Sequence, residues 1–236
     1  MTSELQIHLY ADGAVLEEMV AARREGLVRG FTTNPTLMRK AGITDYPAFA
    51  AQVLKAIPDL PISFEVFADE FPEMERQAKR IAGWGDQVYV KIPITNTRGH
   101  SSLPLIERLA QAGVKLNVTA LLTQAQVEGV AQVLSKDVPA VVSVFAGRIA
   151  DTGRDAKPLM RRSVDILKAL PQAKLLWAST RELYNVFEAQ GCGCHIITVT
   201  PDILKKLSMV GKDLSALSLE TVGMFYRDAS AAGFSL

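Results

Sequence analysis

The chain has 236 residues, of which 48% are hydrophobic and 22% charged, and its formal net charge at pH 7 is +1. These values are typical of one soluble globular domain that needs neither a disulfide nor a metal for stability. The even charge balance and the absence of any block of like charges argue against nucleic acid and acidic membranes as partners. A phosphorylated small molecule needs only one or two local arginines, so it stays open as a ligand.

The N-terminal sequence MTSELQIHLYADG lacks the basic and long apolar regions of a signal peptide, and no apolar run is long enough to span a bilayer. The two cysteines, Cys192 and Cys194, stand beside His195 in GCGCH. A metal site is one interpretation of them, but a structural zinc usually takes four ligands. We favour reduced thiols at the start of a buried strand, and therefore expect a cytoplasmic protein.

Short apolar runs alternate with longer helical patterns along the whole chain. The predicted strands are Ile7–Ala11, Val28–Thr32, Pro61–Phe67, Gln87–Ile92, Val114–Val118, Ala140–Val144, Lys174–Ala178 and His195–Val199. The predicted helices are Val15–Glu25, Tyr46–Ile57, Glu70–Ala82, Ser102–Ala112, Thr123–Leu134, Lys157–Leu170, Arg181–Gln190, Pro201–Leu207 and Ser218–Ala231.

Eight β–α units of this kind predict eight parallel strands joined by right-handed crossovers. The strands are apolar on both sides, as expected where both faces of a sheet are covered. An open doubly wound sheet is the competing architecture, but it would normally carry a glycine-rich phosphate turn after the first strand. That turn reads YADGAV here and has no GxGxxG pattern. The sequence therefore predicts a single-domain α/β fold: a (β/α)8 TIM barrel over residues 1–217, with an extra C-terminal helix in residues 218–236.

Polar side chains stand at or just beyond the C-terminal ends of seven successive predicted strands. Barrels of this architecture build their active sites at that rim. For Asp12, Thr33 and Ser179, capping of a following helix is an equally good interpretation. The polar residues at the rim are Asp12, Thr32, Thr33, Asn34, Glu65, Lys91, Asn117, Thr119, Ser143, Arg148, Ser179 and Arg181.

Lys91 stands near the end of the fourth predicted strand, in the apolar sequence VYVKIPI. Lysines are rarely buried without a partner or a function, and burial favours the neutral amine that attacks carbonyl groups. Lys115 and Lys174 lie at strand starts, which in a barrel lie on the opposite, stabilising face. We therefore favour Lys91 as a nucleophile, with a structural ion pair to Glu65 as the alternative.

Arg148 and Arg181 follow the sixth and seventh predicted strands, close to where such barrels often hold phosphate. Guanidinium groups match phosphate in geometry, and Ser179 would add a hydroxyl donor. Each arginine alone would be interpreted as a solvated surface charge. As a pair on adjacent loops, they indicate a phosphate site.

Five segments, in order along the chain, resemble transaldolases: GFTTNPTL, VYVKIPIT, KLNVTALLTQAQ, VSVFAGRIADTG and LLWASTREL. The chain length is similar to that of the short subfamily that includes fructose-6-phosphate aldolases. The resemblance implies a Schiff-base enzyme that acts on sugar phosphates, with neither a metal nor a cofactor. It also implies a homo-oligomer, a pentamer or decamer, in which the C-terminal helix packs on a neighbouring subunit. The alternative is that this helix folds over its own barrel.

The resemblance also implies roles for individual residues. Lys91 would form the Schiff base, Asp12 would carry the proton of the substrate C4 hydroxyl, and Glu65 and Thr119 would hold a water that acts as acid and base. The remaining residues would bind substrate: Asn34, Asn117 and Ser143 the dihydroxyacetone part, and Arg148, Ser179 and Arg181 the phosphate. Thr32 and Phe145 are also expected among the substrate-binding residues.

Two positions bear on the reaction. The short aldolases of this family resemble one another in having Gln on the third strand and Tyr on the sixth, whereas this chain has Glu65 and Phe145. Both residues favour a transaldolase. The alternatives are a fructose-6-phosphate aldolase and a catalytically silent barrel used as a binding module. The sequence departs from the family at Gly13, after the first-strand Asp, and at Val144, which leaves donor specificity open.

Overall fold

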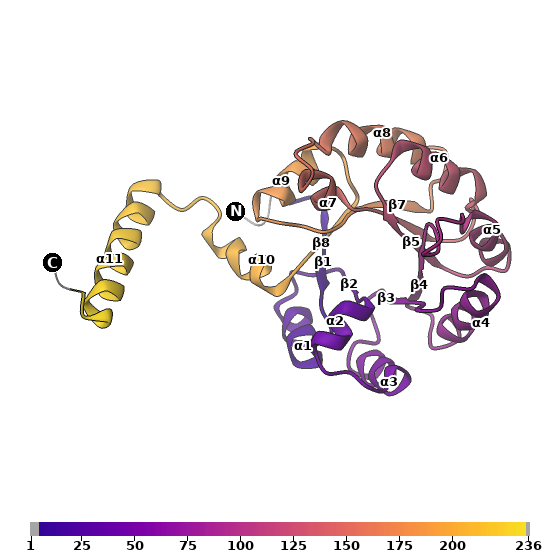
Figure 1. The fold of residues 1–236 in the computed structure, drawn as a ribbon, viewed down its shortest axis with the longest axis horizontal. Helices are drawn as coiled ribbons and strands as arrows, with labels where there is room; N and C mark the ends of the chain where they lie inside the picture. The colour runs from indigo at the N-terminus through magenta and orange to yellow at the C-terminus, as the bar shows by residue number, and fades with distance from the viewer. Residues whose placement is uncertain (1–4, 235–236) are drawn as a thin grey trace.

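The computed structural model describes residues 5–234, and its eight strands pair in sequence order into a closed parallel barrel, β1 to β8 (Figure 1). The predicted barrel segment 1–217 therefore begins, and the predicted C-terminal segment 218–236 ends, with residues outside the described part. The strands are β1 His8–Asp12, β2 Gly30–Thr32, β3 Ile62–Glu65, β4 Val88–Pro93, β5 Leu116–Leu121, β6 Ala140–Val144, β7 Ala173–Trp177 and β8 Ile196–Val199. The predicted TIM barrel is confirmed.

Helices surround the barrel, and one helix, α11, extends away from it (Figure 1). They are α1 Leu16–Glu25, α2 Pro35–Lys40, α3 Tyr46–Ala56, α4 Phe71–Ala82, α5 Leu103–Gln111, α6 Gln124–Val133, α7 Ala146–Ala150, α8 Lys157–Leu167, α9 Tyr184–Gly191, α10 Pro201–Lys206 and α11 Leu214–Ala232, with a 3-10 turn at Leu207–Met209. The short helices α2 and α7 were not predicted. Within residues 5–234, no helix combines the length and apolar character needed to cross a bilayer.

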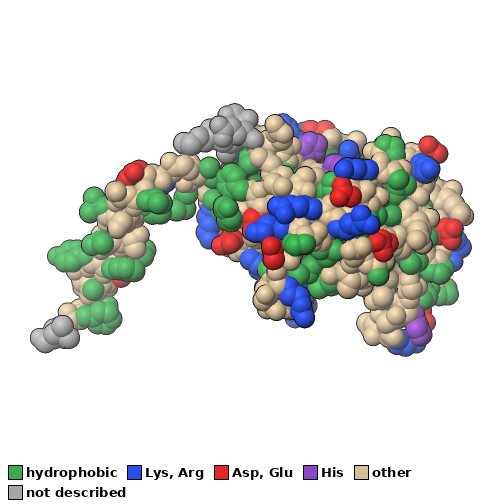
Figure 2. All heavy atoms as spheres, turned by 90° about the horizontal axis from the view of Figure 1, so that it is seen from above, with side chains coloured by type: hydrophobic (Ala, Val, Ile, Leu, Met, Phe, Trp, Pro, Cys, Tyr) green, Lys and Arg blue, Asp and Glu red, His purple; other side chains and the backbone are tan. Residues whose placement is uncertain are grey.

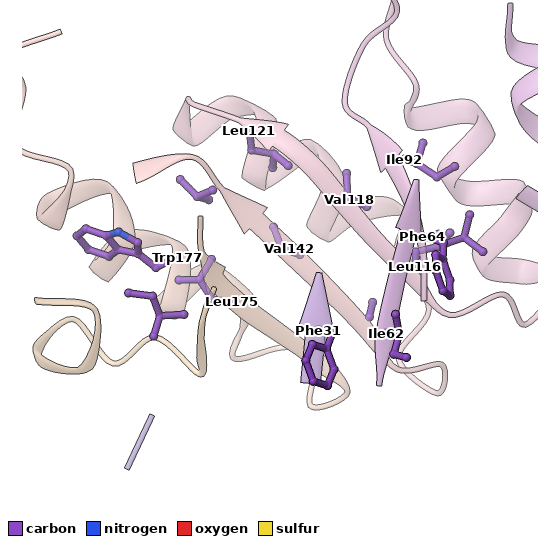
Figure 3. Packing of buried hydrophobic residues seen from close by; sticks show 14 of the residues in the cluster. Phe31, Ile62, Phe64, Ile92, Leu116, Val118, Leu121, Val142, Leu175 and Trp177 are labelled. Atoms are coloured by element: carbon purple, nitrogen blue, oxygen red, sulfur yellow. The ribbon is translucent and has the colours of Figure 1, made fainter. Parts of the chain in front are cut away.

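The main core lies between the strands and this helical layer. Alternate strand residues point outward, and Figure 3 shows side chains such as Phe31, Phe64 and Trp177 packed there. Helix α4 meets this layer through Met74, Gln77, Ala78 and Ile81, a spacing that places all four on one face. Because neighbouring residues on a strand point to opposite faces, this outward set fixes which residues point into the barrel.

A second, smaller cluster fills the barrel interior. Tyr10, Val141, Leu176 and Ile196 come from β1, β6, β7 and β8 and are all buried. Tyr10 reaches across to β2, where a Cβ at Gly30 would lie 2.5 Å from the tyrosine ring, so this position requires glycine. The interior of the barrel is therefore packed with side chains and is not a pore.

Helix α11 begins four residues before its predicted start at Ser218, because the Asp213 side chain accepts a hydrogen bond from the Ala216 amide (2.8 Å) and caps the helix there. It extends away from the barrel, and none of its residues is buried (Figure 1). Leu219, Val222 and Phe225 are all more than half exposed, and apolar side chains gather along this helix in Figure 2.

Candidate active site

A cavity of about 530 Å³ opens at the C-terminal ends of the strands, and every strand contributes at least one residue to its wall. The predicted site residues that line it are Asp12, Thr32, Asn34, Glu65, Lys91, Thr119, Ser143, Phe145, Arg148, Ser179 and Arg181. The parallel strands of a closed barrel bring these residues together, because all of the strands end at the same rim.

Lys91 points into this cavity from β4 and is only 6% exposed. Its Nζ lies 3.1 Å from Oε2 of Glu65, the residue beside it in the β3–β4 register, and it donates to the backbone carbonyl of Thr33 (3.2 Å). The ion pair considered as an alternative role is thus present. Since both partners line the cavity, the pair is positioned to meet a ligand as well as to stabilise the fold.

Asp12 ends β1 and lines the cavity together with Lys91. Thr32 donates to its Oδ1 (2.7 Å), and the Thr32 hydroxyl oxygen in turn lies 2.5 Å from that of Thr198. Burial raises the pKa of the Asp12 carboxyl, while the Lys91 charge and the Thr32 hydrogen bond lower it. Asp12 is not a helix cap, because the cap position of α1 is Val15.

The other two candidate caps have different environments as well. Thr33 is fully buried and donates to the carbonyl of Ser63 (2.9 Å), and the residue that caps α2 is Asn34, whose side chain accepts from the Leu37 amide (3.0 Å). Ser179 lies before the cap position of α9, which is Leu183. The Asn34 side chain therefore caps α2, and Asn34 also lines the cavity, where it was predicted to bind substrate.

Three polar residues form the β5–β6 side of the site. Asn117 is fully buried and does not line the cavity: its amide donates to the Ser63 hydroxyl (2.9 Å) and accepts from the Ser143 hydroxyl (2.7 Å). It therefore lies behind Ser143. The Thr119 hydroxyl is buried without a hydrogen-bond partner among the described residues, and it lines the cavity just before an irregularity in β5 where Ala120 has a φ of 63°.

The arginines lie on the β6–β7 side. The Arg148 guanidinium lies over the Phe145 ring, 5.9 Å from its centroid. Phe145 is the N-cap residue of α7, and Arg148 belongs to the last turn of this short helix. Arg181 donates to both carboxylate oxygens of Asp151, through Nε at 3.0 Å and through Nη2. This hydrogen bonding lowers the pKa of Asp151. Ser179 precedes Arg181 by two residues in the loop after β7, and its backbone is in the left-handed region, with a φ of 60°.

Several cavity residues were missed by the sequence interpretation. Thr198 is the polar residue within the apolar run of β8, so the criterion applied to the other strands would have found it. Lys40 lines the cavity, and Asp151 does not line it but pairs with Arg181. Both were beyond that criterion, because they stand at the ends of the unpredicted helices α2 and α7. Among residues 5–234, there is no group of three or more His, Cys, Asp or Glu side chains arranged to hold a metal ion.

Comparison with known proteins agrees with this geometry. A solved structure from Coccidioides immitis, provisionally assigned to the dihydrodipicolinate synthase family, matches with a TM-score of 0.62 at 16% identity, over 91% of this chain and 76% of that one. At this identity the similarity concerns the fold alone. Proteins named probable transaldolase are closer in sequence. The one from Dehalococcoides mccartyi is 33% identical over 202 residues, which is 85% of this chain and 90% of the relative.

A second relative named probable transaldolase, from Nitrosopumilus maritimus, is 33% identical over 214 residues, which is 90% of this chain and 91% of the relative. The family model described as Transaldolase/Fructose-6-phosphate aldolase matches residues 9–235, which include every residue that lines the cavity. The chain therefore belongs to the transaldolase/fructose-6-phosphate aldolase family.

Proposed function

We propose that this protein is a class I transaldolase, which uses a Schiff base on Lys91 to move a dihydroxyacetone unit from a ketose phosphate to an aldose phosphate. The donor would be of the fructose 6-phosphate or sedoheptulose 7-phosphate type. The observation that carries the proposal is the buried Lys91 amine, which faces a cavity that also holds two carboxylates and two arginines. An amine in such surroundings is suited to attack a carbonyl group.

The reaction begins when the Lys91 ammonium gives a proton to Glu65 and the resulting amine attacks the C2 carbonyl of the ketose. A proton moves from nitrogen to oxygen to form a carbinolamine, Glu65 returns its proton to the carbinolamine hydroxyl, water leaves, and a protonated imine remains. Glu65 lies 3.1 Å from the amine, and together with the Thr119 hydroxyl it holds the water that supplies and removes protons at this step. The buried Thr119 hydroxyl supports this role: it has no hydrogen-bond partner within residues 5–234, and buried polar groups in proteins are normally hydrogen-bonded.

Cleavage follows when Asp12 takes the proton of the C4 hydroxyl. The C3–C4 bond breaks, its electron pair moves to the imine to form an enamine, and an aldose phosphate leaves. The enamine then attacks the aldehyde carbon of the acceptor, Asp12 returns its proton to the new hydroxyl, and water hydrolyses the imine. Arg148, Arg181 and Ser179 hold the phosphate of the donor until its aldose leaves, and then the phosphate of the acceptor.

The alternative is a fructose-6-phosphate aldolase, in which the enamine is protonated and dihydroxyacetone is released. We favour transfer because protonation requires a well-oriented water, and the Phe145 ring on the cavity wall offers no hydroxyl to orient one. We further propose that the enzyme functions in carbohydrate metabolism of the pentose phosphate type, in the cytoplasm, as a homo-oligomer. The exposed apolar residues of α11 support the last point.

Borohydride trapping tests the proposal. With fructose 6-phosphate, wild-type protein is expected to gain the mass of one reduced adduct, located at Lys91 by peptide mass spectrometry. Lys91→Ala and Lys91→Arg should gain none, whereas the control Lys174→Ala, at an exposed position of β7, should behave as wild type. An adduct on Lys91→Ala would show that another lysine is the nucleophile. A wild-type protein without any adduct would instead favour the silent binding module.

A further inference from the structure

Thr198 is a buried residue of β8 that also lines the active-site cavity. Its Oγ1 lies 2.5 Å from Oγ1 of Thr32, which in turn lies 2.7 Å from Oδ1 of Asp12. The three side chains thus form a continuous chain of polar atoms across three neighbouring strands, because β1 pairs with both β8 and β2.

The number of hydroxyl hydrogens fixes the direction of this chain. A threonine hydroxyl has one hydrogen, and an ionised carboxylate accepts only. The Thr32 hydrogen points to Asp12, so Thr198 must be the donor to Thr32. Hydrogen bonds in such a chain polarise one another, which makes the last donor stronger. The Thr198 backbone is itself held, since its carbonyl accepts from the Thr180 hydroxyl (2.7 Å).

We propose that Thr198 is a positioning residue for Asp12: by donating to Thr32 it strengthens the hydrogen bond that holds the Asp12 carboxylate ionised and directed into the cavity. The inference rests on the proposed function, in which the ionised form of Asp12 takes the proton of the C4 hydroxyl. Thr198 need not touch the substrate for this role, because it acts through Thr32.

The surroundings of Asp12 explain why such support matters. Burial raises its pKa, and the nearby Lys91 charge and the Thr32 hydrogen bond counteract that effect. A substitution that weakens the hydrogen bond from Thr32 to Asp12 therefore raises the pKa of Asp12 further. The other titratable and charged groups on the walls of the same cavity are Glu65, Lys40, Arg148 and Arg181. Glu18 and Asp12 both line a second, small cavity beside α1, and Tyr10 lies in the barrel interior.

The experiment compares Thr198→Val, which keeps the shape but loses the hydroxyl, with Thr198→Ser, which keeps the hydroxyl. The first readout needs no substrate: the Asp12 carboxyl carbon, labelled with ¹³C and assigned by its loss in Asp12→Asn, is titrated by NMR. We expect its midpoint in Thr198→Val to lie about 0.5 to 1 pH unit above wild type, and that in Thr198→Ser to match wild type. An unchanged midpoint in Thr198→Val would overturn the inference.

The second readout is the pH profile of transfer from fructose 6-phosphate to erythrose 4-phosphate. In Thr198→Val, the acid limb of the kcat profile should move to higher pH by the same amount. At pH values on that limb, kcat should fall about three- to tenfold, while KM stays within about twofold of wild type. A pH-independent loss would point to a merely structural role and contradict the inference. Ser163→Ala, which removes a buried hydroxyl from α8, is the control for stability.

A variant that fails to fold, and a failure of the proposed function, can each be distinguished from a failure of this inference. If Thr198→Val does not fold, as judged by thermal unfolding, Thr198→Ala is titrated in its place and decides by the same shift. If the wild-type protein forms no borohydride adduct with fructose 6-phosphate, the proposed function fails, while the NMR titration still decides whether Thr198 acts on Asp12.

Discussion

A Cβ atom at Gly147 would lie 1.6 Å from the carbonyl oxygen of Ser179, so only glycine fits where α7 meets the loop after β7. The Gly147 amide also donates to the carbonyl of Ala178 (3.3 Å), which ties the two loops together. The contact brings Arg148, the residue after Gly147, close to the loop that carries Ser179 and Arg181. The proposed phosphate site thus depends on the absence of one methyl group.

Gly147→Ala is therefore expected to displace the Ser179 loop. The free energy of unfolding should fall by about 1–3 kcal/mol, as for other overpacked sites, and KM for a phosphorylated donor should rise. Denaturant unfolding and steady-state kinetics measure the two effects. Gly85→Ala is the matched control, because a Cβ at Gly85 meets nothing within 4 Å. A Gly147→Ala protein as stable and active as this control would contradict the prediction.

The phosphate site itself can be tested through its arginines. Arg148→Ala and Arg181→Ala should each weaken apparent donor binding by about 1.5–3 kcal/mol, the range for hydrogen bonds to charged groups. With a non-phosphorylated donor the loss should be much smaller, and Arg162→Ala, at an exposed position of α8, should lose little with either donor. Equal losses with both donors would identify the two arginines as structural.

Phe145 provides the test of transfer against cleavage. In Phe145→Tyr, the added hydroxyl would orient a water near the enamine, so release of free dihydroxyacetone should rise and transfer to erythrose 4-phosphate should fall. One well-placed acid–base contact changes a rate by about 100-fold, so even a partial effect is measurable. Both products come from one intermediate, and donor binding therefore cancels in their ratio. Phe187→Tyr, on α9 and outside the cavity, is the matched control.

If the wild-type protein already releases dihydroxyacetone as fast as it transfers it, the interpretation of Phe145 and Glu65 is wrong. The aldolase alternative would then replace the proposed function.

Asp12 should make stability depend on pH. Its pKa is raised in the folded protein, mainly by burial, so the folded state binds this proton more tightly than the unfolded state does. Ionisation of Asp12 therefore lowers the free energy of unfolding as the pH rises through the interval between the unfolded and the folded pKa. Asp12→Asn removes this term, and the variant should gain stability relative to wild type at neutral pH, with a smaller gain near pH 4. Urea unfolding at the two pH values measures the difference, and a gain that is larger at pH 4 would contradict it.

The barrel and most of its active-site wall could be predicted from the sequence, because both depend on local patterns. Apolar runs marked the strands, and polar residues at their ends marked the rim. Thr198 fits the same pattern and was overlooked, whereas Lys40 and Asp151 depend on features without such a pattern. Helix α7 has only five residues, too few for a helical period, and so Asp151 and its pairing with Arg181 could not be foreseen.

Asn117 shows a different limit. The predicted strand ended at Val118, which placed Asn117 at the rim. In the structure β5 runs from Leu116 to Leu121, so Asn117 is its second residue and does not line the cavity. Whether an amide reaches a substrate or a neighbouring side chain is decided by residues distant in the sequence, here Ser63 and Ser143. The same holds for Thr32, whose hydroxyl is engaged with Asp12 and Thr198.

Helix α11 leads to a prediction about assembly. Its exposed residues Leu219, Val222, Phe225 and Tyr226 are costly to leave in water, and we expect them to pack against another copy of the chain. A chain ending at Lys212, just before the helix, should then have a mass closer to the monomer in light scattering. A truncated protein that keeps a large oligomeric mass would refute this role, as would a full-length protein that is monomeric.

The packed interior of the barrel has a consequence for the order of events. Tyr10, Val141, Leu176 and Ile196 fill the barrel interior, so within residues 5–234 the cavity opens toward the rim and not through the barrel. In the proposed transfer reaction, both sugar phosphates therefore enter and leave by this opening and use Arg148 and Arg181 in turn. The first aldose has to depart before the second arrives, which gives parallel double-reciprocal plots and makes each aldose an inhibitor that competes with the other for the loaded enzyme.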